Sequence, residues 1–117
     1  MTSHHILGNA LSAKIDRNVD EGNHKVEGTV AFPDVGGAQV GVWEVEPASW
    51  SSIGNDEIFV VLAGRGRVDF TRTGEVADLT PGATVRLYKG EPSVWHITET
   101  LRKIYVINPT AEATHEF

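Results

Sequence analysis

The sequence of 117 residues predicts a single all-β domain, on three observations. From Lys25 onward, short stretches of β-branched and aromatic residues recur at lengths typical of strands. Clusters of Gly, Pro, Asn and Asp, such as PDVGG at residues 33–37, stand between these stretches and favour turns. Apolar residues keep no helical spacing over any long segment, which argues against a parallel α/β sheet. We therefore expect a β-sandwich or β-barrel.

Three parts of the chain differ in their residue pattern. Residues 1–24 contain a mixed polar segment with neither alternation nor a helical period, so we expect an N-terminal arm. Residues 25–108 contain the predicted β domain, and residues 109–117 form a polar C-terminal tail. The GRG at residues 64–66 is interpreted as a hairpin turn between two strands. Strands are expected around residues 28–30, 39–45, 58–63, 67–71, 84–88, 94–97 and 103–107.

Charge and composition argue against several classes of partner. The net charge of −6 would repel duplex phosphate, so we expect no nucleic-acid partner. Cysteine is absent, which excludes disulfides, thiolate nucleophiles and iron–sulfur ligation. The longest apolar run, at residues 58–63, is far shorter than the ~18 residues of a membrane span. With no secretory signal visible, we expect a cytoplasmic protein without a membrane partner, and we assign no role to His4 or His5.

Two spaced motifs resemble those of the cupins. Glu57 is followed after six residues by Gly64, as in the first cupin motif, and PG at residues 81–82 begins a likeness to the second motif. More closely, GVWEVEP at residues 41–47 and ETLRKIYVI at residues 99–107, together with Trp95, resemble one cupin subgroup. That subgroup contains ureidoglycine aminohydrolase, the ethanolamine-utilisation cupins and many small bacterial proteins. The resemblance implies a small antiparallel double-stranded β-helix (a jelly-roll-like cupin barrel), dimeric, with its site at the barrel mouth.

The resemblance also implies a metal-ligand set of three histidines and one glutamate, and most of that set is missing here. Glu57 keeps the carboxylate, whereas the histidine positions hold Trp50, Ser52 and Ser93. His96 cannot replace the last of them without a bulge or a one-residue slip, because side chains alternate between the faces of a strand. Imidazole and carboxylate groups together suit divalent transition metals, and a lone carboxylate with hydroxyls does not. We therefore expect no tightly bound transition metal and no other cofactor.

Other charged residues leave alternatives open. Glu44 and Glu46 share a strand face and, with Glu57, could form an oxygen-rich site for a harder cation; the alternative is a solvated acidic face. The adjacent Arg102 and Lys103 are interpreted as a solvated pair near a sheet edge. The sequence does not decide which way the side chains of Arg86, Tyr88 and Tyr105 point.

The residues at the motif positions predict a pocket inside the barrel. If Glu57 faces inward, a strand period of two turns the side chain of Phe59 inward as well. A desolvated carboxylate among indoles is suited to proton transfer, which makes Glu57 the candidate catalytic residue, and it requires a hydrogen-bond partner such as a nearby hydroxyl or indole N–H. Alternatively, the two tryptophans only fill the barrel. The predicted ligand-binding residues are Trp50, Ser52, Glu57, Phe59, Ser93 and Trp95.

Three functions fit this pattern. The leading hypothesis is a single-domain cupin that binds a small polar metabolite through Glu57 without a transition metal. The first alternative is an enzyme of the hydrolase or lyase type that acts on a ureido or amino compound, as the resemblance suggests. The second is a non-catalytic module that forms a homodimer, because a 12.7 kDa domain gains stability by burying a β surface.

Overall fold

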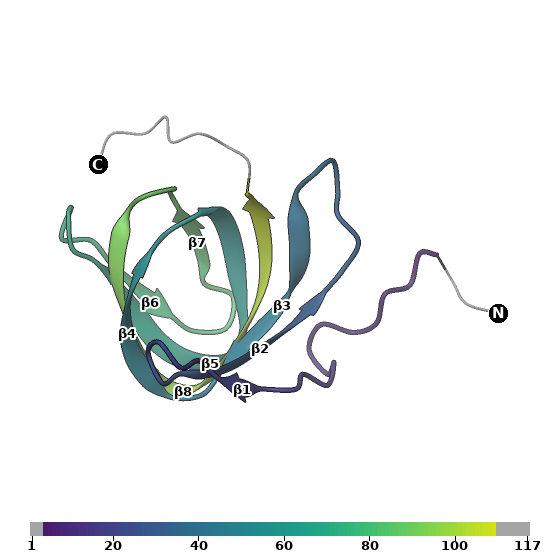
Figure 1. Ribbon diagram of the computed structural model, residues 1–117, viewed down its shortest axis with the longest axis horizontal. Helices are drawn as coiled ribbons and strands as arrows, with labels where there is room; N and C mark the ends of the chain where they lie inside the picture. Colours follow the sequence, from purple (N-terminus) through teal and green to yellow (C-terminus); the bar gives the residue numbers. More distant parts are fainter. Residues whose placement is uncertain (1–3, 110–117) are drawn as a thin grey trace.

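The computed structural model describes residues 4–109, and within them the fold is all-β and antiparallel, as predicted (Figure 1). The predicted tail, residues 109–117, lies almost entirely outside the described residues. No helix that could cross a membrane occurs between residues 4 and 109. The strands are β1 (Asn18–Val19), β2 (Val26–Ala31), β3 (Gln39–Val45), β4 (Ala48–Ile53), β5 (Asp56–Phe70), β6 (Val76–Leu79), β7 (Thr84–Leu87) and β8 (Pro92–Asn108).

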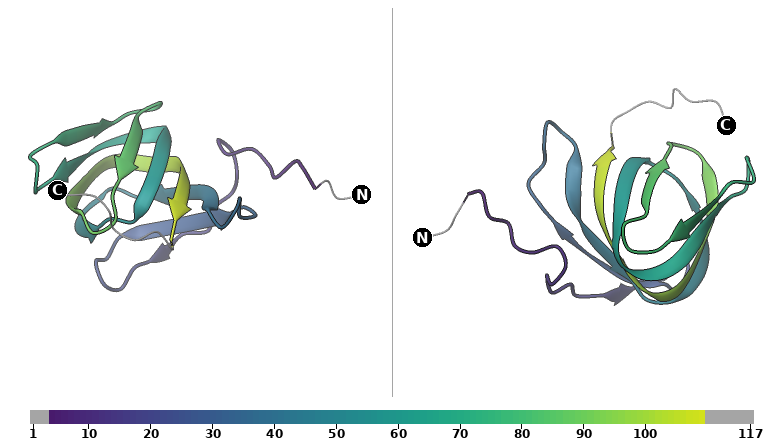
Figure 2. Two further views of the ribbon diagram at one scale, coloured as in Figure 1. Left: turned by 90° about the horizontal axis from the view of Figure 1, so that it is seen from above. Right: turned by 180° about the vertical axis from the view of Figure 1, so that it is seen from behind.

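Two long strands, β5 and β8, organise the sheet. They pair with each other along nearly their whole length, from Asp56 opposite Asn108 to Phe70 opposite Ser93. The main strand order is β1-β2-β3-β8-β5-β6, while β4 adds to β8 and β7 adds to β5. Each long strand therefore pairs with different neighbours along its two halves, and the sheet curls into a barrel (Figures 1 and 2). The core lies inside this curl.

The expected hairpin turn at residues 64–66 is wrong, because β5 continues through it. The register between β5 and β8 shifts between Val61 and Gly66, which marks a β-bulge rather than a turn. Gly64 has a φ of 97°, and a Cβ there would collide with the backbone of β8. The bulge changes which side chains face inward: odd positions such as Phe59 are buried before it, and even positions such as Val68 after it.

The separate strands predicted around residues 94–97 and 103–107 are also one strand, β8. Its buried side chains fall on odd positions throughout, from Ser93 and Trp95 to Leu101 and Tyr105. Because this alternation continues without a phase shift, both halves of β8 present the same face to the barrel interior.

The predicted arm, residues 1–24, joins the sheet through strand β1. Strand β1 pairs with β2, and Ile15 is buried against it. Gly28 on β2 permits this close approach, because a Cβ there would overlap the backbone carbonyl of Asp16 and the side chain of Ile15. Farther toward the N-terminus, the arm extends away from the barrel (Figure 2).

Candidate functional site

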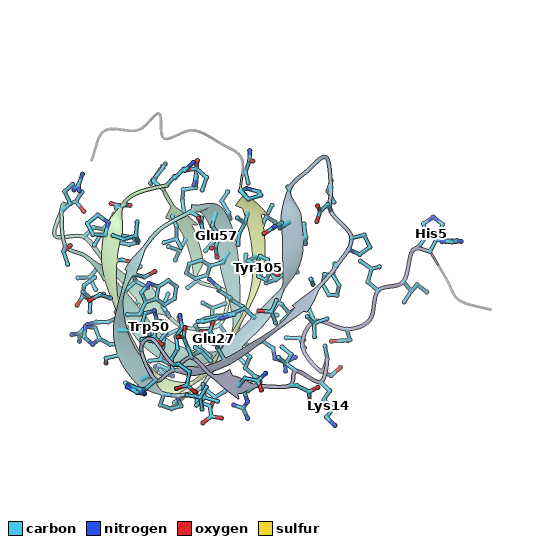
Figure 3. All side chains as sticks on the ribbon, viewed as in Figure 1. His5, Lys14, Glu27, Trp50, Glu57 and Tyr105 are labelled. Atoms are coloured by element: carbon cyan, nitrogen blue, oxygen red, sulfur yellow. The ribbon has the colours of Figure 1, made fainter. Side chains whose placement is uncertain are left out.

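A cavity of about 300 Å³ lies inside the curl of the sheet. Figure 3 shows Glu57, Tyr105, Trp50 and Glu27 gathered within the barrel, far from His5 on the arm. Among the described residues that line the cavity, the charged ones are two lysines and two glutamates: Lys25, Glu27, Glu57 and Lys103. The cavity lining therefore carries four charged side chains, and their formal charges balance.

A buried ion pair joins Glu57 and Lys103. The Lys103 Nζ donates to Glu57 Oε2 at 2.7 Å, and the two side chains are only 7–8% exposed. Glu57 lies on β5 and Lys103 on the neighbouring strand β8, and both point inward. Sequence reasoning expected a hydroxyl or an indole to bond the carboxylate, and it missed the lysine.

The interpretation of Arg102 and Lys103 as a solvated edge pair is wrong. Strand β8 lies between β3 and β5, so it is not an edge strand in this region. Successive side chains on it point to opposite faces, so Lys103 enters the barrel and Arg102 faces outward, where it pairs with Glu44. Lys103 shares the inward face of Leu101 and Tyr105, which is the pattern that identifies it.

Aromatic rings also lie close to the Lys103 ammonium. Its Nζ lies 4.2 Å from the ring centroid of Phe59, 4.7 Å from that of Trp43 and 5.1 Å from that of Trp95. These ring faces attract a cation but replace little of its lost hydration. Burial therefore lowers the pKa of Lys103 below its usual value of 10.5, although the Glu57 carboxylate partly opposes the shift.

Tyr105 lies on the same inward face of β8. Burial, followed by the negative charge of Glu57, raises the pKa of its phenol above 10.0. Gly41 on β3 pairs with Tyr105 in the sheet, and a Cβ at that glycine would lie 2.5 Å from the phenol oxygen. Gly41 thus leaves the room that allows the tyrosine to line the cavity.

Three tryptophans form the aromatic wall. The Trp50 and Trp95 rings are stacked, with centroids 5.6 Å apart and planes 11° apart. Trp43 meets both edge-on, at 6.3 Å from Trp50 and 6.1 Å from Trp95. Trp43 also donates its indole N–H to Glu27 Oε1 at 2.8 Å. Trp43 was not among the predicted site residues, although its odd position on β3 and its β-pairing place it on the inward face.

A second lysine–glutamate pair lines the cavity beside these rings. Lys25 Nζ lies 3.3 Å from Glu27 Oε2 and 4.7 Å from the Trp50 ring centroid. Lys25 follows the turn between β1 and β2, and Glu27 lies on β2. The cavity thus has one ion pair on the β5–β8 side and another on the β2 side, with indoles between them.

The predicted site residues fall into two groups. Trp50, Ser52, Glu57 and Trp95 all line the cavity. Phe59 and Ser93 are buried behind this lining instead. The Phe59 ring lies 5.7 Å from that of Trp95, and Ser93 Oγ accepts the Trp95 indole N–H at 3.2 Å. These two residues therefore support the wall rather than form it.

The three side chains whose direction the sequence left open do not all face the cavity. Tyr105 lines the cavity, whereas Arg86 and Tyr88 are not among the lining residues. Arg86 pairs with Asp56 at 3.1 Å, and its guanidinium carbon lies 4.3 Å from the Tyr88 ring centroid.

The residues present do not fit a transition metal of the kind the cupin resemblance implies. Glu57 is the one potential ligand among the four motif positions, and it is already paired with Lys103. His96 lies on the other face, where its ring contacts Ser49 and Asp69. Within residues 4–109, no three His, Asp or Glu side chains are grouped so that they could hold an ion. We therefore derive no chemistry through a metal.

The alternative oxygen-rich site also fails, because its three carboxylates are separated. Glu44 and Glu46 lie on the outside of the sheet, where both contact Arg17. Glu57 points into the barrel. Successive side chains alternate between the two faces of a strand, so Glu44 and Glu46 point away from the cavity that Trp43 lines.

The curled antiparallel sheet with a glutamate inside it is a cupin-type barrel, and solved structures have the same fold. The Clostridium difficile EutQ protein matches with a TM-score of 0.70 at 22% identity, over 86% of this chain and 83% of that chain. A protein of unknown function from Rhizobium leguminosarum matches at 0.62 and 26% identity, over 71% and 81%. One from Pseudomonas syringae pv. tomato matches at 0.70 and 21%, over 83% of this chain and 45% of its own.

The family itself follows from a sequence comparison. The model of the EutQ-like cupin domain matches residues 33–105, which is more than half of the chain. The protein belongs to this EutQ-like cupin family, and the resemblance noted in the sequence is confirmed. No protein in the curated set matches the chain.

Proposed function

We propose that the barrel binds a small polar metabolite, with Glu57 and Lys103 as its buried charged contacts and without a tightly bound transition metal. The observation that supports this most directly is an ion pair with side chains 7–8% exposed that lines an open cavity. A buried charge pair contributes little to stability compared with apolar side chains of the same volume, because desolvation opposes its attraction. A pair placed at a cavity wall instead suits recognition of a ligand.

The charges favour a neutral or zwitterionic ligand that offers a donor beside an acceptor. Two lysines and two glutamates line the cavity, so a ligand with a large net charge gains no compensating field. Lys103 can donate to a ligand oxygen, and the carboxylate of Glu57 can accept from a ligand N–H. Amides, ureido compounds and amino acids have this pairing of groups.

The test is a thermal-shift screen of amides, ureido compounds and amino acids, followed by calorimetric titration of each compound that stabilises the protein. Glu57→Gln keeps the volume of the side chain but removes its charge, and we expect binding to weaken at least about tenfold, as for loss of a charged hydrogen bond. Glu46→Gln, on the outer surface, is the matched control and should bind like the wild type. If the Glu57→Gln variant binds with the same affinity as the wild type, Glu57 is not a ligand contact.

The second candidate is an enzyme of the hydrolase or lyase type that acts on a ureido or amino compound. What favours it is the proximity of a carboxylate and an amine whose pKa is lowered, since such pairs can move a proton. Release of ammonia from a compound found in the screen supports this candidate. Recovery of every bound compound unchanged supports binding alone.

A homodimer remains part of the proposal. Ile58 on β5 and Val106 on β8 are cross-strand neighbours, and they are 49% and 46% exposed. Adjacent apolar side chains on the outer surface of a sheet suit burial against a second copy. Light scattering at micromolar concentration tests this: a dimer mass is expected, and a monomer mass contradicts it.

A further inference from the structure

Lys103 has an environment that ion pairing alone does not explain. Lys103 lines the cavity, and among the described residues the one carboxylate in hydrogen-bond contact with its amine is Glu57, at 2.7 Å. The remaining close groups are the ring faces of Phe59, Trp43 and Trp95, between 4.2 and 5.1 Å from the Nζ. Ring faces accept no strong hydrogen bond, so two of the three ammonium N–H groups have only weak partners among these neighbours.

This environment favours the neutral amine. A lysine in an apolar site with few hydrogen-bond acceptors loses the hydration that stabilises its charge, and burial lowers the pKa of Lys103 accordingly. Glu57 is in direct contact and can take the proton that the ammonium releases. A neutral lysine amine is a nucleophile, and desolvation in a hydrophobic pocket is one of the ways proteins activate it.

We propose that Lys103 is a nucleophile that condenses with an aldehyde or ketone in the barrel cavity to form an imine, with Glu57 as the proton carrier. This inference rests on the proposed function, because the carbonyl compound must enter the same cavity. It goes beyond that function in naming a covalent step and the carbonyl class of substrate.

The step balances without any added oxidant or reductant. Glu57 takes a proton from the Lys103 ammonium, and the neutral amine adds to the carbonyl carbon while the carbonyl π pair moves to oxygen. The resulting alkoxide takes a proton from the added nitrogen, the carboxyl of Glu57 protonates the hydroxyl so formed, and the C–O bond breaks. Water leaves, and the nitrogen lone pair completes the C=N bond. The products are an iminium on Lys103, a carboxylate on Glu57 and one water, with the proton count unchanged.

The other cavity lysine provides a comparison within the molecule. Lys25 pairs with Glu27 at 3.3 Å, and its side chain is 15% exposed, against 8% for Lys103. Lys25 therefore retains more contact with water. Lys14 lies exposed on the arm, well outside the barrel (Figure 3), and serves as a reference amine.

The experiment traps the imine. The purified full-length chain is incubated at neutral pH with hydroxyacetone or with pyruvate, one neutral and one anionic ketone, in the presence of cyanoborohydride. Cyanoborohydride reduces an iminium to a stable secondary amine, which adds the mass of the ketone less one oxygen atom. Ketones are chosen because aldehydes label ordinary surface lysines. Peptide mapping by mass spectrometry then identifies the labelled residue.

We expect Lys103 to carry at least about tenfold more label than Lys14, since a desolvated amine holds more of the nucleophilic form. Lys103→Arg keeps the positive charge beside Glu57 but has no amine that can condense, so its label at this position should be lost. Lys14→Arg, the matched control, should leave the labelling of Lys103 unchanged. Thermal unfolding of both variants shows whether each is folded.

The result that overturns the inference is an absence of label on Lys103 in the wild type with both ketones, or label spread equally over the lysines. Tryptophan fluorescence during a titration without reductant separates this from failure of the proposed function. Quenching without label means that the cavity admits the ketone but Lys103 does not condense with it. In that case the binding proposal stands and the imine is excluded.

Discussion

Arg102 and Lys103 are neighbours on β8, and each pairs with a glutamate, but on opposite sides of the sheet. Outside, Arg102 pairs with Glu44, and it also donates to the carbonyl of Ala10 on the arm. Arg17 extends that network to Glu46. Inside, Lys103 has Glu57 and the aromatic rings.

The comparison separates charges that hold the structure together from charges that are available to a ligand. The outer groups share several partners, and those partners attach the N-terminal arm to the barrel. Within residues 4–109, the inner pair has one ionic contact, between Lys103 and Glu57, and it borders a cavity. Similar residue types on adjacent positions thus have different roles, and the difference arises from which face of the strand each side chain occupies.

The largest effect is expected from breaking the inner pair. Lys103→Met leaves the Glu57 carboxylate buried without its cation, which should destabilise the protein by about 3–5 kcal/mol. The double variant Glu57→Leu with Lys103→Met removes both charges and should recover most of that loss, while abolishing ligand binding. Urea unfolding of the wild type, the single variant and the double variant measures the loss of stability and its recovery. A single variant within about 1 kcal/mol of the wild type would mean that the inner pair resembles a surface pair.

A pH series distinguishes the inner pair in a second way. The folded state lowers the pKa of Lys103 below 10.5, so between the lowered pKa and 10.5 the unfolded chain binds more protons and stability should rise with pH. Tyr105 acts in the opposite direction: its pKa is raised above 10.0, so from that pH upward stability falls. The Lys103 slope cannot exceed about 1.4 kcal/mol per pH unit.

Chemical unfolding across the alkaline range measures these slopes. The double variant Glu57→Leu with Lys103→Met should lose the rise of stability with pH that Lys103 causes. The outer charges are unchanged in this variant, so their contribution to the pH profile should remain. If the stability of the wild type and that of the double variant depend on pH in the same way, folding does not shift the pKa of Lys103.

The outer network should give the smallest effect. Arg102→Met removes contacts to Glu44 and to the Ala10 carbonyl, and a loss of about 1 kcal/mol is expected because these groups are closer to solvent. Hydrogen exchange should increase in the arm before β1 and stay unchanged around the cavity. Faster exchange in β5 and β8 instead would show that the outer pair also supports the barrel interior.

The sequence predicted the fold class and the family resemblance because both depend on local patterns. Alternating β-branched residues, turn clusters and the spacing from Glu57 to Gly64 can be read without knowing which strands pair. The cupin resemblance pointed to Trp50 and Ser52, alternation added Trp95 through the face it shares with Ser93, and these three residues line the cavity. Extending the same odd-numbered alternation from Trp95 along β8 would have reached Lys103.

Only the tertiary structure decided what stands beside Glu57. Whether a strand lies at an edge or in the centre depends on its partners, and β8 is central because β3, distant in sequence, pairs with one side of it. The phase change in β5 likewise arises where the strand bends around the barrel at its bulge. Strand order and register are properties of the whole sheet, and they placed the ammonium of Lys103 against the carboxylate of Glu57, within a ring of aromatic side chains.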